Sequence, residues 1–346
     1  MTNTITTIYA GIDVHKRSWE VQCMSDHIVL KRFNLTTPNA DRLATLLKMQ
    51  YPNMKLKCAY EAGFCGFGIQ RQLEMLGIET IVVHPADIPT TDWEKRHKTD
   101  PIDCKKIANG LRSKMIKGIY IPSEDQTRDR SIVRYRYTIA SDLRRVKNRI
   151  TSHLDFFGIN PSADQHSYWS KAYIRQLQAL AEELSDHTLL TMVEHLCIQR
   201  DLLAKSMREL RLMTKSEKYK DKVGLLRSIP GVGLLTIMVY ITEIGDVSRF
   251  KNDDHYYSYL GFVPGSRSSG ETQRIGKLTK RGNKRVRTAL VLSAWMSIRS
   301  CPEMLRLYET YRSNNMPANK AIIKIARKLS LIMKALIRDR KKYNPY

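Results

Sequence analysis

Acidic residues, paired cysteines and long apolar runs are all scarce in this chain of 346 residues. Asp and Glu number 34 against 58 Lys and Arg, which gives a formal net charge of +24. The six cysteines contain no C-x-x-C pair, which argues against a disulfide framework or a zinc knuckle. No uncharged apolar run approaches the roughly 18 residues of a membrane span, and the first residues lack the pattern of a signal peptide. We therefore expect a cytoplasmic protein with reduced thiols and no membrane partner.

The excess positive charge is concentrated in three segments. Residues 127–150, 265–288 and 320–342 carry net charges of +6, +7 and +8, so the rest of the chain is close to neutral. Lys and Arg gathered in this way gain affinity for a polyanion by releasing the counterions condensed on its phosphates. Ordinary solvated helix faces and an acidic membrane surface are the alternatives, but the basic segments lack the Trp- and Phe-rich apolar face of an interfacial helix. The charge pattern therefore favours nucleic acid as the partner.

The first hundred residues alternate between short strands and helices. The spacing of the apolar residues predicts strands at 8–14, 19–24, 27–35, 55–61 and 78–84, and helices at about 39–49, 67–76 and 100–117. The order β-β-β-α-β-α-β-α is typical of an α/β layer with a mixed sheet. We assign this domain to residues 1–126.

The rest of the chain is predicted to be mainly helical. Apolar residues recur at steps of three, four or seven over 127–157 and again over 189–210, which predicts a coiled-coil helical hairpin at 127–218 with an irregular tip. A mainly α-helical domain is expected at 219–346. Within it, IPGVG is placed as the turn of a helix-hairpin-helix unit, where Gly231 and Gly233 would let the backbone approach a phosphate. A plain turn between two helices is the alternative.

Four carboxylates are placed where the α/β layout would bring them together. Asp13 lies on the first strand, Glu61 ends the fourth, and Asp100 and Asp103 open the next helix and share one of its faces. Carboxylate oxygens suit Mg²⁺, and two such ions stabilise the attacking and leaving oxygens of a phosphoryl transfer. Capping of the helix before Pro101 is the alternative for the paired acids. An unpaired carboxylate inside a sheet is costly, so Asp13 points to a function.

Residues 258–288 form a basic stretch rich in glycine and serine, for which we expect a loop ahead of an apolar helix at 288–298. Small residues and cations suit a backbone that closes on phosphate. An exposed serine in such a loop can act as a nucleophile if a neighbour or a metal activates it. The alternative is that the serines are only turn or cap residues.

These motifs together resemble a known family. GIDVHK, the strand that ends at Glu61, KTDPIDCKKIA, IPGVG and LGFVPGSRSSGETQRIGKLTKRGNKRVR look like the DEDD-type transposases of insertion sequences. The family is related to pilin-gene invertases, and some members are bridge-RNA-guided recombinases. The resemblance covers nearly the whole chain. It implies a RuvC-like (RNase H) fold for the first domain, with Asp13, Glu61, Asp100 and Asp103 as an acidic tetrad that holds Mg²⁺.

The resemblance also implies a mechanism and partners. Ser269, the serine before glycine in the SG motif, would form a covalent phosphoserine link to DNA, with Ser266 and Ser268 as alternatives if the loop register differs. The implied partners are double-stranded donor and target DNA, a structured noncoding guide RNA, and further copies of the chain in a dimer or tetramer. The implied location is the bacterial nucleoid. Because the acids and Ser269 are far apart in sequence, we expect a site composed from different subunits.

The polar residues around Ser269 are expected to bind nucleic acid. We expect the basic residues of this set to hold phosphates: Arg267, Arg274, Lys277, Lys280 and Arg281. Asn283 and Arg287 are expected to brace the loop or the backbone. Gly231 and Gly233 of the earlier turn complete the predicted nucleic-acid-binding set. Two other functions stay open. One is a RuvC-like junction nuclease in which water attacks, and the other is a non-catalytic nucleic-acid-binding scaffold whose acids are only caps. A covalent DNA-protein adduct distinguishes the recombinase from both.

Overall fold

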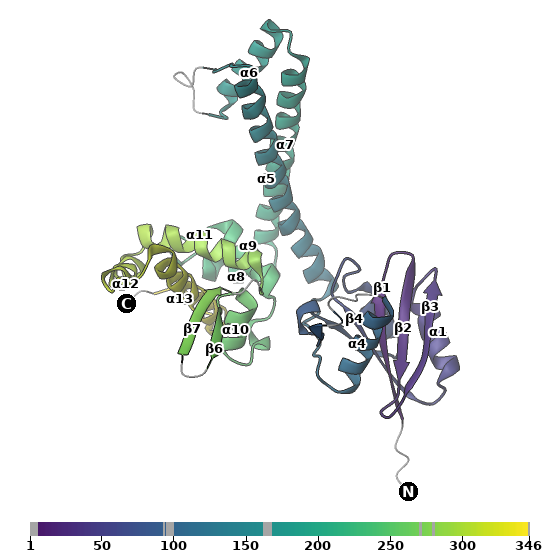
Figure 1. The fold of residues 1–346 in the computed structure, drawn as a ribbon. Helices are drawn as coiled ribbons and strands as arrows, with labels where there is room; N and C mark the ends of the chain where they lie inside the picture. The colour runs from purple at the N-terminus through teal and green to yellow at the C-terminus, as the bar shows by residue number, and fades with distance from the viewer. Residues whose placement is uncertain are drawn as a thin grey trace. The chain divides into compact units, whose positions relative to one another are not determined.

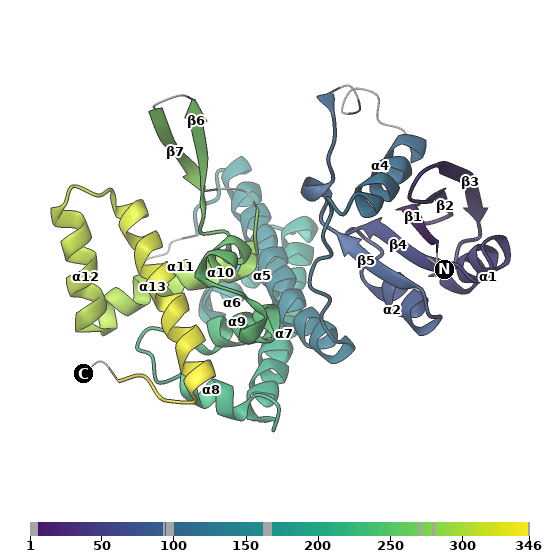
Figure 2. The same ribbon diagram turned by 90° about the horizontal axis from the view of Figure 1, so that it is seen from below.

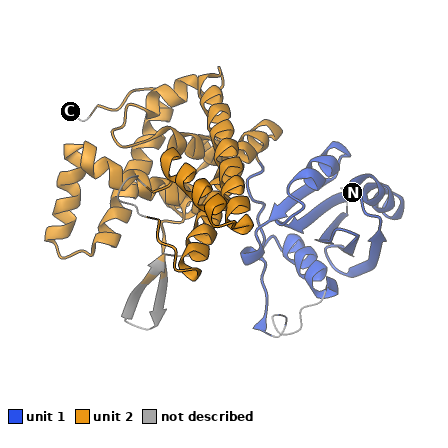
Figure 3. Ribbon diagram, turned by 90° about the horizontal axis from the view of Figure 1, so that it is seen from above, with its two compact units in different colours: residues 1–121 blue, residues 122–346 orange. Residues whose placement is uncertain are grey.

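The computed structural model describes residues 6–92, 94, 100–161, 168–269, 272–278 and 281–344. For residues 266–269, 272–275 and 277 it describes the backbone alone. The chain divides into two compact units, residues 1–121 and 122–346, which Figure 3 shows in blue and orange. No helix among the described residues combines the length and the apolar character that crossing a membrane requires.

Unit 1 is built on a five-stranded mixed sheet with the order β3-β2-β1-β4-β5. β1 pairs antiparallel with β2 and parallel with β4, β2 pairs antiparallel with β3, and β4 pairs parallel with β5. The strand bounds are β1 Thr7–Val14, β2 Ser18–Met24, β3 Val29–Thr36, β4 Lys55–Glu61 and β5 Glu79–Val83. The sheet confirms the predicted α/β layer and is consistent with the RuvC-like fold that the resemblance implies.

Helices cover both faces of this sheet. α1 (Ala40–Gln50) and α2 (Gly68–Met75) lie on one side, and α4 (Asp100–Arg112) lies on the other (Figure 2). Alternate strand residues explain the division, because side chains two apart point to the same face. Ile8, Ala10 and Ile12 join the core under α1 and α2, whereas their odd-numbered neighbours in β1 face α4. Asp13 therefore lies on the α4 face.

α4 ends earlier than the sequence predicts. The apolar spacing predicts a helix to about residue 117, but the last helical residue is Arg112. The chain reverses through Lys114, which has a positive φ of 56°, and the backbone N–H of Met115 donates to the carbonyl of Gly110. Ile116 then folds back against Gly110, where a Cβ would lie 2.8 Å from its side chain. The later apolar residues thus belong to a return segment rather than to the helix.

The first part of unit 2 is an arm of three helices. α5 (Glu124–Phe156) and α7 (His187–Lys215) pack against each other, and α6 (Lys171–Glu183) packs against α7 near their outer ends (Figure 1). The arm has a core of its own, in which Ile150, Leu177 and Val193 are fully buried. The two long helices match the predicted runs. α6 was not predicted, because its segment lies between the expected irregular tip and the second apolar run, and no element was assigned to it.

The rest of unit 2 is a helical body with one β-hairpin. Its large apolar core is formed by the helices that follow the arm. The elements are α8 Lys220–Leu226, α9 Leu234–Ile244, η2 Val247–Arg249, α10 Asp253–Leu260, β6 Pro264–Ser269, β7 Thr272–Leu278, α11 Lys284–Ser300, α12 Pro302–Ser313 and α13 Ala318–Asp339. This confirms a helical carboxy-terminal part.

The glycine- and serine-rich stretch is a hairpin rather than the loop that the sequence predicts. β6 pairs antiparallel with β7, and the register joins Arg267 to Arg274 and Ser269 to Thr272. Gly, Ser and charged residues have weak strand propensity, so composition alone predicted irregular backbone. The prediction was wrong because ladder hydrogen bonds are satisfied by backbone groups whatever the side chains are.

Candidate acidic site and its basic counterpart

The acidic site depends on an unusually close contact between α4 and β1. A Cβ placed on Gly11 would lie 2.2 Å from the carbonyl oxygen of Cys104 and 2.3 Å from the backbone nitrogen of Ala108. A residue with any side chain would therefore push the helix away from the strand. Because Gly11 and Asp13 point to the same face of β1, this contact brings the first turn of α4 to the end of the strand that carries Asp13.

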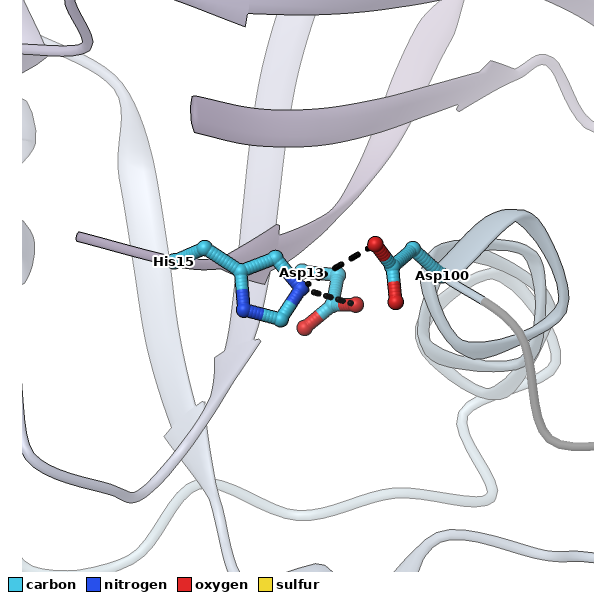
Figure 4. A group of neighbouring side chains, drawn as sticks. All are labelled: Asp13, His15 and Asp100. Carbon is cyan, nitrogen blue, oxygen red and sulfur yellow. Dashed lines mark ion pairs between the residues drawn. The ribbon is translucent and has the colours of Figure 1, made fainter. Parts of the chain in front are cut away.

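Asp13, His15 and Asp100 converge at this point (Figure 4). The Nε2 atom of His15 lies 3.3 Å from an oxygen of Asp13 and 3.3 Å from an oxygen of Asp100. One ligand atom from each of the three residues lies within 4.8 Å of the others. The side chain of Asp13 is 20% exposed and that of Asp100 is 61% exposed, so the group opens to solvent on the side of the helix.

The surroundings of Asp13 disfavour its charged form. Burial raises the pKa of the Asp13 carboxyl, and the charges of Asp100 and Asp103 raise it further, while His15 opposes the shift. Three acids at one strand end repel one another unless a cation offsets their charge. The electrostatics are therefore those of a site that gains from binding a cation.

Glu61 and Asp103 line a neighbouring pocket of about 290 Å³. In the parallel register Ile12 pairs with Tyr60, so Asp13 and Glu61 are the next residues of two adjacent strands. Asp103 also forms a 2.6 Å ion pair with Lys106, and both side chains are largely buried. The structure thus brings Asp13 and Asp100 into one cluster and Glu61 and Asp103 into one pocket at the same edge of the sheet.

Three residues near the acids were not predicted. His15 was visible in the motif GIDVHK, and a histidine two residues after a strand acid is a signal that sequence reasoning could have used. Lys106 follows Asp103 at the i,i+3 spacing of a helical ion pair. Glu94 also lines the pocket, and its carboxylate accepts hydrogen bonds from the backbone and hydroxyl of Thr91. Nothing in the sequence pattern marked Glu94.

The predicted nucleophile lies in the other unit. Ser269 is the last residue of β6, and its side chain lies outside the described part of the structure. The same holds for the side chains of Ser266, Ser268, Arg267, Arg274 and Lys277, and Lys280 lies wholly outside the described residues. Of the predicted phosphate-binding residues near the hairpin, the structure describes the side chains of Arg281, Asn283 and Arg287.

Two glycines hold the ends of the hairpin together. Gly261 and Gly282 both have positive φ, and a Cβ on Gly282 would lie 2.5 Å from the backbone nitrogen of Gly261. The guanidinium of Arg287 donates to the carbonyl of Gly261 at 3.0 Å. Arg281 is exposed at the hairpin's exit. Arg287 therefore contacts the backbone at the base of the hairpin.

Asn283 caps α11 and joins it to a buried acid. Its side-chain oxygen accepts from the backbone N–H groups of Arg285 and Val286, and its amide donates to the carboxylate of Glu243 at 2.8 Å. Both polar atoms of Asn283 are thus used inside the protein. These bonds fix the start of α11, directly after the hairpin.

Glu243 is the centre of a charged network at the base of the arm. It is 1% exposed, and its carboxylate receives two hydrogen bonds from Arg134 of α5, at 2.7 and 2.8 Å. Burial would raise the pKa of Glu243, but the ion pair with Arg134 and the bond from Asn283 outweigh it and hold the pKa below its usual value. Glu243 was not among the predicted residues, although a single acid in the apolar run LLTIMVYITEI was a visible signal.

The glycines of the IPGVG turn have different surroundings. A Cβ on Gly231 would lie 2.4 Å from the backbone nitrogen of Ser297 in α11, so this glycine permits close packing of the turn on that helix. Gly233 caps α9, is exposed, and has open space around it. Packing therefore accounts for Gly231 without a phosphate, whereas Gly233 keeps an accessible backbone.

Comparison with known proteins agrees with this arrangement. A family model for DEDD transposases of the IS110 type matches residues 10–159, and the model described as the transposase IS116/IS110/IS902 family matches residues 223–309. The two matches cover the acidic site and the hairpin respectively. The chain belongs to the IS110-type DEDD transposases.

Individual relatives extend along most of the chain. It is 36% identical to a putative transposase of Sinorhizobium fredii over 68% of this chain and 57% of that protein. It is 28% identical to the transposase for insertion sequence element IS1533 of Leptospira borgpetersenii, over 71% of this chain and 72% of the relative. The transposase for IS1328 of Yersinia enterocolitica is 23% identical over 82% of both chains. The chain thus spans little more than half the length of the Sinorhizobium relative.

Proposed function

We propose that this protein is the DNA transposase of an insertion sequence, a recombinase that is guided by RNA and that cuts and rejoins DNA. The observation that carries the proposal is the cluster of Asp13, His15 and Asp100 next to the Glu61 and Asp103 pocket, in a chain that belongs to a transposase family. The basic segments support nucleic acid as the ligand, because their charge is concentrated rather than spread over the chain.

The acidic residues fit a divalent metal. Asp13 and Asp100 present carboxylate oxygens within 4.8 Å of each other. Burial and the charges of Asp100 and Asp103 raise the pKa of Asp13, and a cation would offset both effects. Oxygen ligands favour Mg²⁺, and Asp13, Glu61, Asp100 and Asp103 are the residues that would hold it. When bound, Mg²⁺ offsets negative charge on the phosphate that reacts. His15 orients the carboxylates of Asp13 and Asp100 by contacting both.

Ser269 is the proposed nucleophile. Its hydroxyl oxygen forms a bond to the phosphorus of the scissile phosphodiester, the P–O bond to the leaving strand breaks, and the serine proton passes to the leaving oxygen. Attack by that freed hydroxyl, or by a hydroxyl of another strand, reverses the step and restores a phosphodiester. The phosphoserine bond conserves the energy of the broken bond, so rejoining needs no ATP.

The remaining residues bind and position the nucleic acids. Arg267, Arg274, Lys277, Lys280 and Arg281 would contact phosphates around Ser269, and the exposed backbone of Gly233 would contact a further one. Asn283 and Arg287 hold the base of the hairpin through the bonds described above. Base pairing by a structured guide RNA would supply the sequence specificity for donor and target DNA. We assign the arm formed by α5, α6 and α7, which corresponds to the predicted hairpin at 127–218, to assembly of a dimer or tetramer.

Covalent trapping tests the chemistry. Wild-type protein mixed with guide RNA and target DNA is expected to nick the DNA and to leave a protease-resistant peptide stub on it, and Ser269→Ala is expected to leave none. Ser266→Ala and Ser268→Ala are the matched controls and should retain it. An adduct that persists in Ser269→Ala would overturn the assignment of the nucleophile.

A metal-dependent nuclease is the second candidate, because the acidic cluster by itself suits attack by water. That function predicts free nicked ends from both wild type and Ser269→Ala.

Sequencing of the RNA that copurifies with the protein tests separately whether an RNA guides the recombinase. A discrete RNA whose loops match the exchanged DNA ends supports the proposal, and absence of a discrete species counts against it.

A further inference from the structure

Two cations of the arm meet at one tryptophan. Lys147 of α5 places its ammonium 5.2 Å from the centre of the Trp169 ring, and Arg200 of α7 donates to the carbonyl oxygen of Trp169 at 2.7 Å. Trp169 lies just before α6, so three separate parts of the arm converge here. The three side chains are half-buried.

This pair of cations has no acidic partner in the described part of the arm. Neither Lys147 nor Arg200 forms an ion pair with a described carboxylate, and Arg200 uses one of its five N–H donors in the bond to Trp169. Burial and the nearby charge of Arg200 lower the pKa of Lys147. Two like charges held close together cost free energy, and a bound anion removes that cost.

The backbone at Trp169 is held in an uncommon conformation. Its φ of +63° lies in the left-handed region, which a large side chain adopts only when its surroundings enforce it. The bond from Arg200 and the edge-on contact with Tyr173, at 5.7 Å between ring centres, do so here. The preceding residue, Tyr168, is 61% exposed, and its ring lies beside that of Tyr173, with 5.3 Å between the ring centres.

We propose that Tyr168, Lys147 and Arg200 form a binding site for an unpaired nucleotide of a nucleic acid strand. Lys147 and Arg200 bind the phosphate, and a base stacks on the exposed ring of Tyr168. An aromatic face next to cations is the combination by which proteins hold single strands without reading their sequence. The inference rests on the proposed function only in taking nucleic acid as the ligand, and it adds a contact on the arm, distant along the chain from Ser269.

Binding of single strands by the full-length protein tests the site. The probes are fluorescent 12-nucleotide oligouridylate, the matching deoxyoligonucleotide and a blunt DNA duplex, each titrated across a range of salt concentrations. Tyr168→Ala is expected to weaken binding of the single strands about tenfold, because one base loses its stacking partner. Lys147→Ala and Arg200→Ala are each expected to lower the slope of log affinity against log salt by about 0.7.

Lys205→Ala is the matched control, since it removes one exposed positive charge from α7 outside the site. It is expected to stay within about twofold of wild type for the single strands. The emission of Trp169, identified by comparison with Trp169→Phe, is expected to change on addition of oligouridylate in wild type and in Lys205→Ala. Stronger binding of the ribose strand than of the deoxyribose strand points to RNA, and equal binding points to either kind of strand.

Folding is checked by thermal unfolding of each variant. Tyr168 is exposed, so its removal tests the site even if Lys147→Ala or Arg200→Ala unfolds. The inference is overturned if folded Tyr168→Ala binds single strands as wild type does, or if it loses affinity equally for the blunt duplex, which offers no unpaired base. Because these measurements need no strand exchange, their outcome is independent of whether Ser269 forms an adduct.

Discussion

The guanidinium of Arg134 and the carboxylate of Glu243 form a two-point ion pair, with N–O distances of 2.7 and 2.8 Å. Arg134 belongs to the arm, whereas Glu243 ends α9 in the helical body and also binds Asn283 at the start of α11. Arg130 adds a bond to the carbonyl of Glu243 at 2.7 Å. One buried carboxylate therefore connects the arm to the element that follows the hairpin of Ser269.

Replacement of this carboxylate should be costly. Glu243→Gln is expected to lower the free energy of unfolding by about 2 to 3 kcal/mol, because it leaves Arg134 and the largely buried Arg130 without their charged partner. The cost is moderated because the side chain of Arg134 is 43% exposed and water can replace part of the interaction. Chemical denaturation measures it, and Glu217→Gln at an exposed site is the control. A loss under about 0.5 kcal/mol would show that the network contributes little.

The contact between α4 and β1 should not tolerate a side chain. Gly11→Ala is expected to destabilise the protein by about 1 to 3 kcal/mol, because its Cβ would lie 2.2 Å from the carbonyl oxygen of Cys104. Gly68→Ala has open space at the start of α2 and is expected to be neutral or slightly stabilising. Urea unfolding compares the two variants. Equal stability of Gly11→Ala and wild type would mean that the helix can move outward freely.

Removal of one acid should abolish the response to a divalent metal. After treatment with EDTA, addition of Mg²⁺ or Mn²⁺ is expected to raise the melting temperature of the wild type, since a ligand that binds the folded state stabilises it. Asp13→Asn is expected to lose this increase, because Asp13 contributes the least exposed carboxylate of the cluster with His15 and Asp100. Asp41→Asn, at an exposed acid in the first turn of α1, should respond as the wild type does. An unchanged response in Asp13→Asn would refute the metal assignment.

Lowering the pH is expected to destabilise the outer end of the arm by protonating Asp186. Its carboxylate caps α7 and contacts Nε2 of His153 at 2.6 Å, and these bonds hold the pKa of Asp186 below its usual value. A carboxyl whose pKa is lower in the folded state stabilises the fold at pH values above its pKa in the unfolded state, which is ~3.9. That stabilisation is lost as the pH falls through the pKa of the folded state. Asp186→Asn keeps a capping side chain but is expected to lose about 1 kcal/mol at neutral pH.

Unfolding curves collected between pH 7 and pH 2 check this difference. The stability gap between wild type and Asp186→Asn is expected to close at the acid end of the range, where both side chains are uncharged. A gap of constant size across the range would contradict the role of the charge.

The sheet and the long helices were predictable because burial imposes its period on the sequence. Ile8, Ala10 and Ile12 alternate with residues of the other face, and the arm repeats its apolar residues at helical steps. The same logic placed Asp13 and Glu61 at adjacent strand ends and Asp100 in the next helix. These inferences rely on local patterns, which a single sequence contains.

Contacts between distant segments were not predictable. Arg134 and Glu243 are 109 residues apart, and neither has a pattern that identifies its partner. The hairpin was missed because its backbone bonds, not its side chains, make the strands. Helix α6 was missed since it follows a segment rich in Pro and Ser that favours irregular backbone. The sequence therefore did not predict which residues, far apart along the chain, contact each other in the fold.

The close contact between Gly261 and Gly282 has a consequence for which segments of the chain can be exchanged. The hairpin leaves and rejoins the helical body at almost a single point, since the backbones of the two glycines are in direct contact. The core of the body takes Phe262 from the start of this excursion and is otherwise built from residues outside it. A chain in which residues 263–281 were exchanged for a shorter turn, or for the hairpin of another relative, would keep that core. The hairpin is in this sense an exchangeable module at the surface of the helical body.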